Sequence, residues 1–359
     1  MEHVVIAPRP APPPVHRPLS GMLFGDALSA AITIGAVALI ALMLPPLNWA
    51  LLDAVWSSPD APNACRAGGA CWAYLHDKAR LILFGIYPPD QQWRPVLVIA
   101  LIVAMVLASL SPRLWNARLL LLWATAIGVM LLLMQGGVLG LVRVETAKWG
   151  GLPVTLLLAV LSLGLGFPMA VLLALGRQSD LPIVKAISVS VIELVRGLPL
   201  VGLLFVAAIL LPLLLPAGWT IDKLGRTVAA LTIFAAAYLA EVLRGGLQGL
   251  GPGQAEAARA LGIPYWKMIW HVIMPQAIQK VIPPLTNTAI VMVKNTSLVM
   301  IVGVFDMLGA GRAAAGDPAW PAPFTETYLF VAAIYLAICF SISIYARWLE
   351  RGVKARSHA

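Results

Sequence analysis

The sequence predicts an all-α polytopic membrane protein, and two properties of its composition lead to that fold class. Of its 359 residues, 60% are hydrophobic and only 11% are charged, too little charge to cover the surface of a soluble protein. Apolar runs of about 18 residues or more, the length of a membrane-spanning helix, recur along the chain. The first of them, 27–44, contains no charged residue. These runs exclude an ordinary soluble fold.

The apolar runs and the breaks between them predict about eight transmembrane helices. The seventh is the least regular, because Pro283, Pro284, Lys294 and Asn295 interrupt it. The predicted helices cover about 27–45, 95–111, 119–142, 152–176, 192–215, 227–247, 281–303 and 325–346.

The two ends of the chain are expected to lie outside the bilayer. Residues 1–22 are rich in proline, and since such segments stay extended and do not pack, they predict a disordered tail. A Pro-rich ligand for a partner protein is the alternative for the same residues. Residues 352–359 form a short basic tail.

The distribution of Lys and Arg predicts the orientation in the membrane. With a cytoplasmic N-terminus, 15 of these residues fall in cytoplasmic segments and nine in external ones. The cytoplasmic side of a membrane protein carries the excess, so both termini are predicted to be cytoplasmic and the loop 46–94 periplasmic. This topology accounts for the net charge of +9, and nucleic acid is not an expected partner.

Two of the three cysteines lie close together in the predicted periplasmic loop. Cys65 and Cys71 frame the sequence CRAGGAC, whereas Cys339 lies in an apolar run. The loop pair could form a disulfide if the loop is outside the cytoplasm. No metal site is expected, because the spacing is wider than CxxC and His76 stands alone near it.

The chain lacks the motifs of common enzyme sites. It contains no GxxxxGK phosphate loop followed by Ser or Thr, no HExxH and no GxSxG. Its five histidines are scattered, so neither a nucleophile with its base nor a cluster of metal ligands is visible. We therefore expect a protein that is not an enzyme and binds no cofactor itself.

A polar segment between the sixth and seventh predicted spans reads as two short helices joined by a turn. The residues 254–261 have high helix propensity, and Glu256 lies in the first turn, where a carboxylate suits the helix dipole. Gly262 can adopt the left-handed conformation that ends a helix, and Pro264 suits the start of the next one. Pro275 is predicted to break that second helix. The segment could rest on lipid headgroups or dock a soluble partner.

Several stretches of the sequence carry a resemblance to a known family. The polar segment has the pattern EAA, then Gly six residues after Glu, then a closing aliphatic-x-aliphatic-Pro. Its signature residues are Glu256, Ala257, Ala258, Gly262, Val272, Met274 and Pro275. This pattern resembles that of permease subunits of bacterial ABC importers. ELVRGLPL at 193–200, the run 238–262 and VKNTSLVMIVGVFDML at 293–308 are similar to the HisMQ-like permeases for polar amino acids.

The resemblance implies a particular architecture. A five-helix type I importer core would occupy 148–351, with a coupling helix at 254–262. A three-helix extension, 23–147, would precede it and carry the periplasmic loop. This extension is similar to that of the M-type permease of general L-amino-acid importers.

The resemblance also implies a function and partners. The chain would be a permease subunit in the bacterial inner membrane that moves L-amino acids by alternating access. A separate ATPase with ATP and Mg²⁺ would drive it, a second, different permease would complete the pore, and a periplasmic binding protein would deliver the substrate. A stand-alone secondary transporter is one alternative, although no inverted repeat is visible. A membrane scaffold or receptor without ATP coupling is another.

Two sets of residues are predicted to carry this function. ATPase coupling is assigned to Glu256, Ala257, Ala258, Arg259, Leu261 and Gly262. The translocation path is assigned to Asn287, Thr288, Lys294, Asn295 and Glu241, because polar residues within spans often mark a pathway. A structural ion pair between Glu241 and Arg244 is the alternative role for that acid, and Lys294 and Asn295 could instead cap a broken helix.

Overall fold

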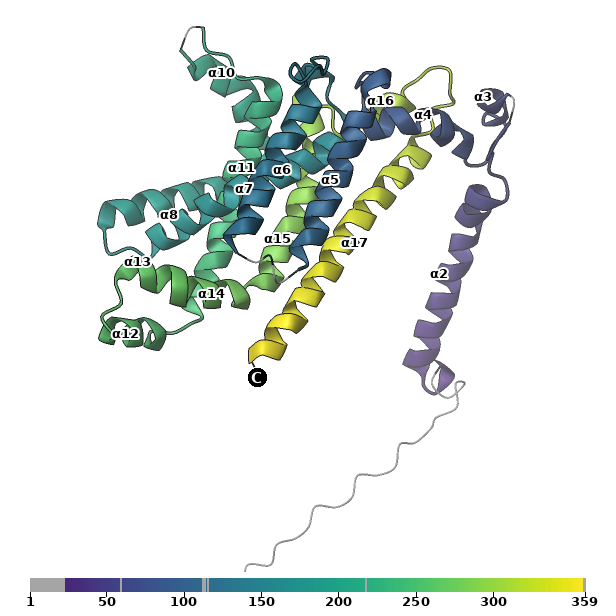
Figure 1. Cartoon of the computed structure of the whole chain (residues 1–359). Coiled ribbons are helices and arrows are strands. Elements are labelled where there is room, and N and C mark those ends of the chain that lie inside the picture. The colour runs from purple at the N-terminus through teal and green to yellow at the C-terminus, as the bar shows by residue number, and fades with distance from the viewer. Residues whose placement is uncertain (1–22, 59, 112–113, 115, 217, 358–359) are drawn as a thin grey trace, which may run out of the picture. The chain divides into compact units, whose positions relative to one another are not determined.

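The computed structural model describes residues 23–357 except 59, 112, 113, 115 and 217, and it is helical throughout (Figure 1). Within these residues there is no β-strand, only two isolated bridges. Among the described residues, seven helices are long and apolar enough to cross a membrane, or eight if one sharply bent pair counts as a span. The predicted disordered tail, 1–22, lies outside the described residues. The predicted basic tail continues the last helix as far as Ser357.

The chain divides into two compact units, Met1–Trp72 and Ala73–Ala359. In the first unit, α2 (Ala27–Leu51) starts at Asp26, whose side chain accepts a hydrogen bond from the Ser29 amide. The 25 residues of α2 reach a mean hydropathy of 2.4 in their most apolar stretch, which is long and apolar enough to cross a membrane. Because the division falls after Trp72, the predicted extension 23–147 is shared between the two units.

A disulfide closes the loop that follows α2. Cys65, after the short helix α3 (Ala61–Ala64), is bonded to Cys71, and their Cα atoms are 5.3 Å apart. The Trp72 indole donates a hydrogen bond to the Ala50 carbonyl at 2.7 Å and stacks on Trp56 with ring centroids 6.0 Å apart. The disulfide and the indole contacts together order this loop.

The second unit begins with α4 (Trp72–Phe84), η1 (Pro89–Gln91), α5 (Trp93–Ser109) and α6 (Ala117–Gln135). The predicted span 119–142 is too long, since α6 ends at Gly136, where φ is +65°. Gly136 and Gly137 both have positive φ, which glycine adopts without strain. Residues 136–142 therefore form a loop although they are apolar.

A buried arginine holds this loop in place. Arg94 is fully buried in the first turn of α5 and donates to the carbonyls of Leu133 at 2.5 Å and Val142 at 2.8 Å. Its guanidinium also lies 5.8 Å from the centre of the Tyr87 ring. Arg94 thereby joins the two ends of the loop to α5.

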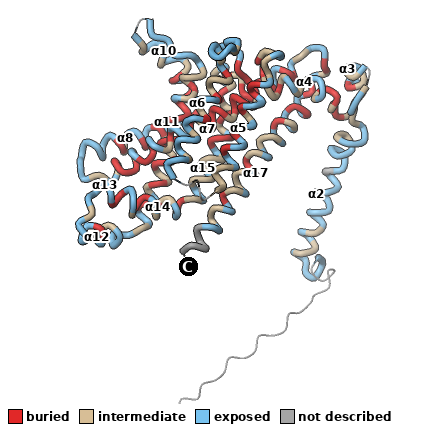
Figure 2. Tube along the Cα trace, in the orientation of Figure 1, coloured by how far each residue is buried: buried red, intermediate tan, exposed pale blue. Residues whose placement is uncertain are grey.

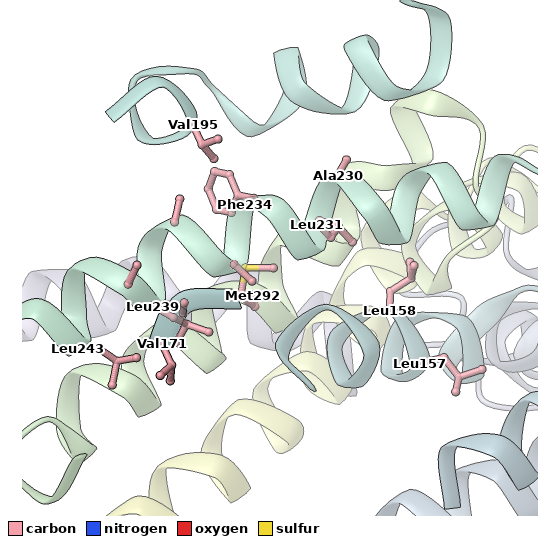
Figure 3. Packing of buried hydrophobic residues seen from close by; sticks show 14 of the residues in the cluster. Leu157, Leu158, Val171, Val195, Ala230, Leu231, Phe234, Leu239, Leu243 and Met292 are labelled. Carbon is pink, nitrogen blue, oxygen red and sulfur yellow. The ribbon is translucent and has the colours of Figure 1, made fainter. Parts of the chain in front are cut away.

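The centre of the second unit is a bundle around two long helices, α7 (Gly151–Arg177) and α11 (Lys223–Gln248). Around them lie α15 (Ile282–Asn295), α16 (Met307–Ala315) and α17 (Phe324–Ser357). Figure 3 shows Leu158 of α7 facing Leu231 of α11, and Met292 of α15 beneath Phe234 of α11. Buried residues concentrate along α7 and α11, as the red segments in Figure 2 show.

The predicted span 192–215 is wrong as a single helix. The structure has an amphipathic helix, α8 (Pro182–Gly197), and then α9 (Leu200–Phe205), a π-helical turn η4 (Val206–Leu210) and α10 (Leu211–Leu214). The two parts meet at 105° because Leu198 and Pro199 are extended, with ψ of 139° at both. A residue before proline avoids the helical region, and this favours the bend. The seventh span likewise changes character, from α15 to the 3-10 helix η6 (Thr296–Val302).

Helix α4 is fastened to the connection between α16 and α17. The Tyr74 hydroxyl accepts a hydrogen bond from Thr327 at 3.2 Å, and Lys78 forms an ion pair with Asp317 at 2.8 Å. The hydrogen bond from Lys78 lowers the pKa of Asp317, and the same bond raises the pKa of Lys78. Part of the predicted extension therefore packs on the core.

Replacing Arg94 should unfold the loop that it holds. Arg94→Met would leave the Leu133 and Val142 carbonyls without their donors, at a cost of about 3 kcal/mol in the free energy of unfolding. The expected result is a lower thermal midpoint in detergent and faster proteolysis within 136–147. Arg80→Met is the matched control, since Arg80 is exposed and its guanidinium donates to the Gln92 side chain, with no main-chain carbonyl depending on it among the described residues. Equal midpoints for both variants would contradict this role of Arg94.

Candidate functional site

The polar segment after α11 folds into two helices joined by a glycine turn. Helix α12 (Gly253–Ala260) has Glu256 in its first turn and Arg259 in its last. Gly262 follows with φ of +71°, and the amides of Gly262 and Ile263 bond the carbonyls of Arg259 and Ala258. Helix α13 (Tyr265–Met268) then begins after an extended Pro264. The left-handed conformation predicted for Gly262 is confirmed.

The residues predicted to couple to an ATPase differ in their exposure. Leu261 is 78% exposed at the tip of the turn, a large apolar side chain in a polar surrounding. Glu256, Ala257, Arg259 and Gly262 are also exposed. Ala258, by contrast, is only 4% exposed and belongs to the main hydrophobic core. It fixes α12 to the rest of the chain instead of facing outward.

Pro275 does not break the helix, contrary to the prediction. Residues Ile269–Ile273 form a π-helical turn, η5, and α14 (Met274–Lys280) continues from it with Pro275 in its first turn. The wider π turn changes the hydrogen-bond register, so the missing N–H of proline is tolerated. The direction changes instead at Val281, with φ of −109° and ψ of 13°.

Contacts return the α12–α14 segment to the end of α11. The Lys280 ammonium donates to the Gly249 carbonyl at 2.5 Å. The Gln276 amide donates to the Gln254 side chain at 3.3 Å. The Lys280 contact thus attaches the end of α14 to the residue that ends α11, and the Gln276 contact joins α14 to the start of α12.

A network of charged side chains joins α7, α8 and α11 two turns before the end of α11. Glu241 and Arg244 form a double contact, with Nη2 to Oε1 at 2.5 Å and Nε to Oε2 at 2.9 Å. Arg177 of α7 lies 2.7 Å from Glu193 of α8 and 3.4 Å from Glu241. Arg196 of α8 approaches Glu241 at 3.8 Å. Three arginines therefore surround one carboxylate.

The ion pair between Glu241 and Arg244 follows from their spacing, but the rest of the network does not. Arg177 is 64 residues from Glu241 along the chain, and the bend after α8 brings Glu193 and Arg196 to it. The sequence did hold a signal for this network: Arg177 lies in the last turn of α7, and Glu193 and Glu241 lie on two other helices. The Glu241 side chain is 22% exposed and its oxygens are engaged by arginines, which favours the structural role.

One face of α15 forms an exposed stripe that includes two of the predicted path residues, Asn287 and Lys294. Pro284, Asn287, Val291 and Lys294 are exposed at spacings of three and four residues, which places them on one face. Met292 and Val293 are buried on the opposite face. The remaining two predicted path residues are less available: the Thr288 hydroxyl donates to the Pro284 carbonyl at 2.9 Å, and Asn295 is half-buried.

Comparison with known proteins identifies the class of this helical bundle. The family described as binding-protein-dependent transport system inner membrane component matches residues 166–355. An Escherichia coli K12 protein, the inner membrane amino-acid ABC transporter permease protein YhdY, is 43% identical over 92% of this chain and 90% of its own. The Rhodobacter capsulatus glutamate/glutamine/aspartate/asparagine transport system permease protein BztC is 36% identical over 99% and 98%.

A solved structure shares the core of the chain. It is the crystal structure of an amino acid ABC transporter with histidines, 34% identical with a TM-score of 0.50. The similarity covers 56% of this chain and 91% of the other. The bundle is thus the membrane-spanning part of an importer. The chain belongs to the family of binding-protein-dependent transport system inner membrane components, as a multi-pass inner-membrane permease subunit of an ABC importer and not an enzyme.

Neutralising Glu241 should lower the rate of substrate uptake while the rate of ATP hydrolysis changes little. Glu241→Gln would leave Arg177, Arg196 and Arg244 facing one another without their shared carboxylate, so α7, α8 and α11 would no longer move together. The expected result in the reconstituted transporter is an uptake rate about tenfold lower, equivalent to about 1.4 kcal/mol, with ATP hydrolysis largely retained. Uptake of radiolabelled substrate and phosphate release measure the two quantities.

Glu193→Gln is the matched control for this variant. The Glu193 side chain is 52% exposed, and a pair so open to solvent contributes little. Its uptake rate should stay within about twofold of wild type. Equal effects of the two substitutions would contradict a special role for Glu241.

Proposed function

We propose that this chain is the permease subunit of an ATP-driven importer of L-amino acids, with α12 and its turn as the docking element for a separate ATPase. One observation carries the proposal: an apolar tip, Leu261, stands exposed directly after α12, a short charged helix whose Ala258 is buried in the core. A ligand can shift a conformational equilibrium only if it binds the two states differently. A docking element attached firmly to one long helix gives the ATPase such a differential contact.

The proposal that the substrate is an amino acid rests on the two relatives that align with most of this chain. Two permeases that align with nearly the whole chain carry amino-acid transport in their names. In this proposal a second permease subunit completes the pore, a binding protein delivers the substrate, and ATP and Mg²⁺ are bound by the ATPase alone. Family membership weighs against a stand-alone secondary transporter and against a scaffold without transport.

The orientation in the proposal has both termini and α12 in the cytoplasm. The excess of Lys and Arg on that side supports it. The disulfide between Cys65 and Cys71 supports it too, because disulfides persist in the periplasm and are rare in the cytosol. The start of α11 then faces the periplasm, roughly 39 Å from its cytoplasmic end at the rise of an α-helix.

The path of the substrate runs, in this proposal, along the exposed stripe of α15. Asn287 and Lys294 are exposed there and can offer hydrogen bonds. Lys294 is the one charged side chain of this helix. It would attract the carboxylate of a zwitterion.

Making the tip of the coupling turn acidic should prevent ATPase docking. Leu261→Asp removes the apolar contact, and a side chain this exposed in the free subunit can change without disturbing the fold. Co-purification of the ATPase and ATP-driven uptake should both fall by at least about tenfold, as expected for an anchor at the centre of an interface. Leu261→Met, which keeps an apolar tip, should retain both. Full assembly and uptake with Leu261→Asp would contradict the docking role.

Cysteine accessibility can test the stripe on α15. In a Cys339→Ser background, Asn287→Cys and Lys294→Cys should react with a charged, membrane-impermeant thiol reagent, because the thiolate reacts only where water reaches it. Val293→Cys, at a buried position, is the control and should react at least about tenfold more slowly. Stripe positions that face lipid would stay unreactive throughout the transport cycle, and the path would then lie elsewhere.

A further inference from the structure

An open cavity of about 430 Å³, with walls made mostly of exposed residues, lies at the end of α11 opposite to α12. Its walls come from three places: the last residue of α6, the linker between α6 and α7, and the residue that caps α11. They are Gln135, Arg143, Glu145, Thr146, Ala147 and Asp222. The volume is in the range of small-molecule sites. In the proposed orientation this cavity opens to the periplasm.

The walls of the cavity are held by main-chain contacts. The Val144 amide donates to the Gln135 carbonyl at 2.7 Å, and the buried Trp149 indole donates to the Val144 carbonyl at 3.1 Å. Buried Arg94 holds the neighbouring Val142 carbonyl. The linker is therefore an ordered wall, and ligand binding would not have to order it first.

The side chains that face the cavity remain available. Across the described part of the chain, the structure records no hydrogen bond or ion pair from the side chain of Arg143 or Glu145. Asp222 uses one carboxylate oxygen to accept the Gly225 amide at 3.1 Å and keeps the other. One guanidinium and two carboxylates are thus presented to one small volume.

This arrangement complements a free α-amino acid. The Arg143 guanidinium can bind a carboxylate with two parallel hydrogen bonds, and the acids can accept hydrogen bonds from an ammonium group. Gln135 and Thr146 add a neutral amide and a hydroxyl. The two acids outnumber the one cation, so a ligand with an additional carboxylate is repelled.

We propose that this cavity is a second, low-affinity substrate site, which binds zwitterionic L-amino acids with uncharged polar side chains before they enter the helix bundle. The inference rests on the proposed amino-acid importer function. All but one of the lining residues precede residue 166, where the family match begins; only Asp222 lies within it. The site is therefore built mainly by the N-terminal extension, to which it gives a function.

Binding to the full-length chain in lipid nanodiscs tests the proposal directly. Radiolabelled L-glutamine should bind saturably with a millimolar dissociation constant, and L-glutamate should bind at least tenfold more weakly. Arg143→Gln and Glu145→Gln should each weaken L-glutamine binding about tenfold. Asp222→Asn should weaken it while preserving the helix cap, since Asn caps as well as Asp. Arg312→Gln removes an exposed arginine of α16 outside the cavity and should leave binding unchanged.

The outcomes separate this proposal from the proposed function. Absent or unsaturable L-glutamine binding, with ATP-driven uptake intact in the assembled complex, would overturn the cavity site alone. An assembled complex that drives no amino-acid uptake would overturn the proposed function and the cavity site with it. Suppose that Arg143→Gln leaves L-glutamine binding unchanged but raises the concentration of binding protein needed for half-maximal uptake. The residues would then form a protein-docking surface, and the small-molecule site would be excluded.

Discussion

The close contact of α7 and α11 is the interaction on which the other elements depend. A methyl group on Gly166 of α7 would lie 3.0 Å from the Ala235 side chain and 3.2 Å from the Thr232 carbonyl of α11, so the two helices pack tightly at this glycine. Lipid tails are as apolar as leucine, so membrane helices are held by such close packing and not by the hydrophobic effect. Helices α8, α15 and α16 all pack on α7, and α8 and α15 also pack on α11. A bulky residue at this crossing would displace the whole bundle.

Helix α11 also connects the proposed docking element to the pore. A methyl group on Gly246 would lie 2.8 Å from the Ala277 carbonyl. Helix α14 therefore approaches α11 at Gly246 as closely as α7 approaches it near Ala235. Lys280 bonds the Gly249 carbonyl beyond it, and Ala258 anchors α12 in the core. With these three attachments, force applied to the tip of α12 reaches α11 without a flexible link. The paired charges around Glu241 extend the same rigid body to α7 and α8.

Much of the fold could be predicted from the sequence, because spans of apolar residues have few alternatives in a membrane. The left-handed turn at Gly262 and the pairing of Glu241 with Arg244 are local properties, set by neighbours within four residues. The errors have a common physical cause: composition does not show where an apolar run bends. Leu198 and Pro199 turn the chain by 105° inside such a run, and a π-helical turn carries the chain past Pro275. Arg177 joins the network only through tertiary packing, which no local pattern encodes.

The charged side chains at the two ends of α11 differ in whether they are paired with other charges, and this difference suits a structural role at one end and ligand binding at the other. Near the end that leads to α12, Glu241 is enclosed by arginines and its oxygens are engaged. Bonds of that kind hold helices together, and they are strong because they are charge-assisted and geometrically fixed. Near the other end, Arg143 and Glu145 are exposed, and Asp222 keeps an oxygen unengaged. Exposed charges hold a ligand weakly and exchange it quickly, which suits a waiting site. Tight binding there would retain the substrate that the pore has to receive.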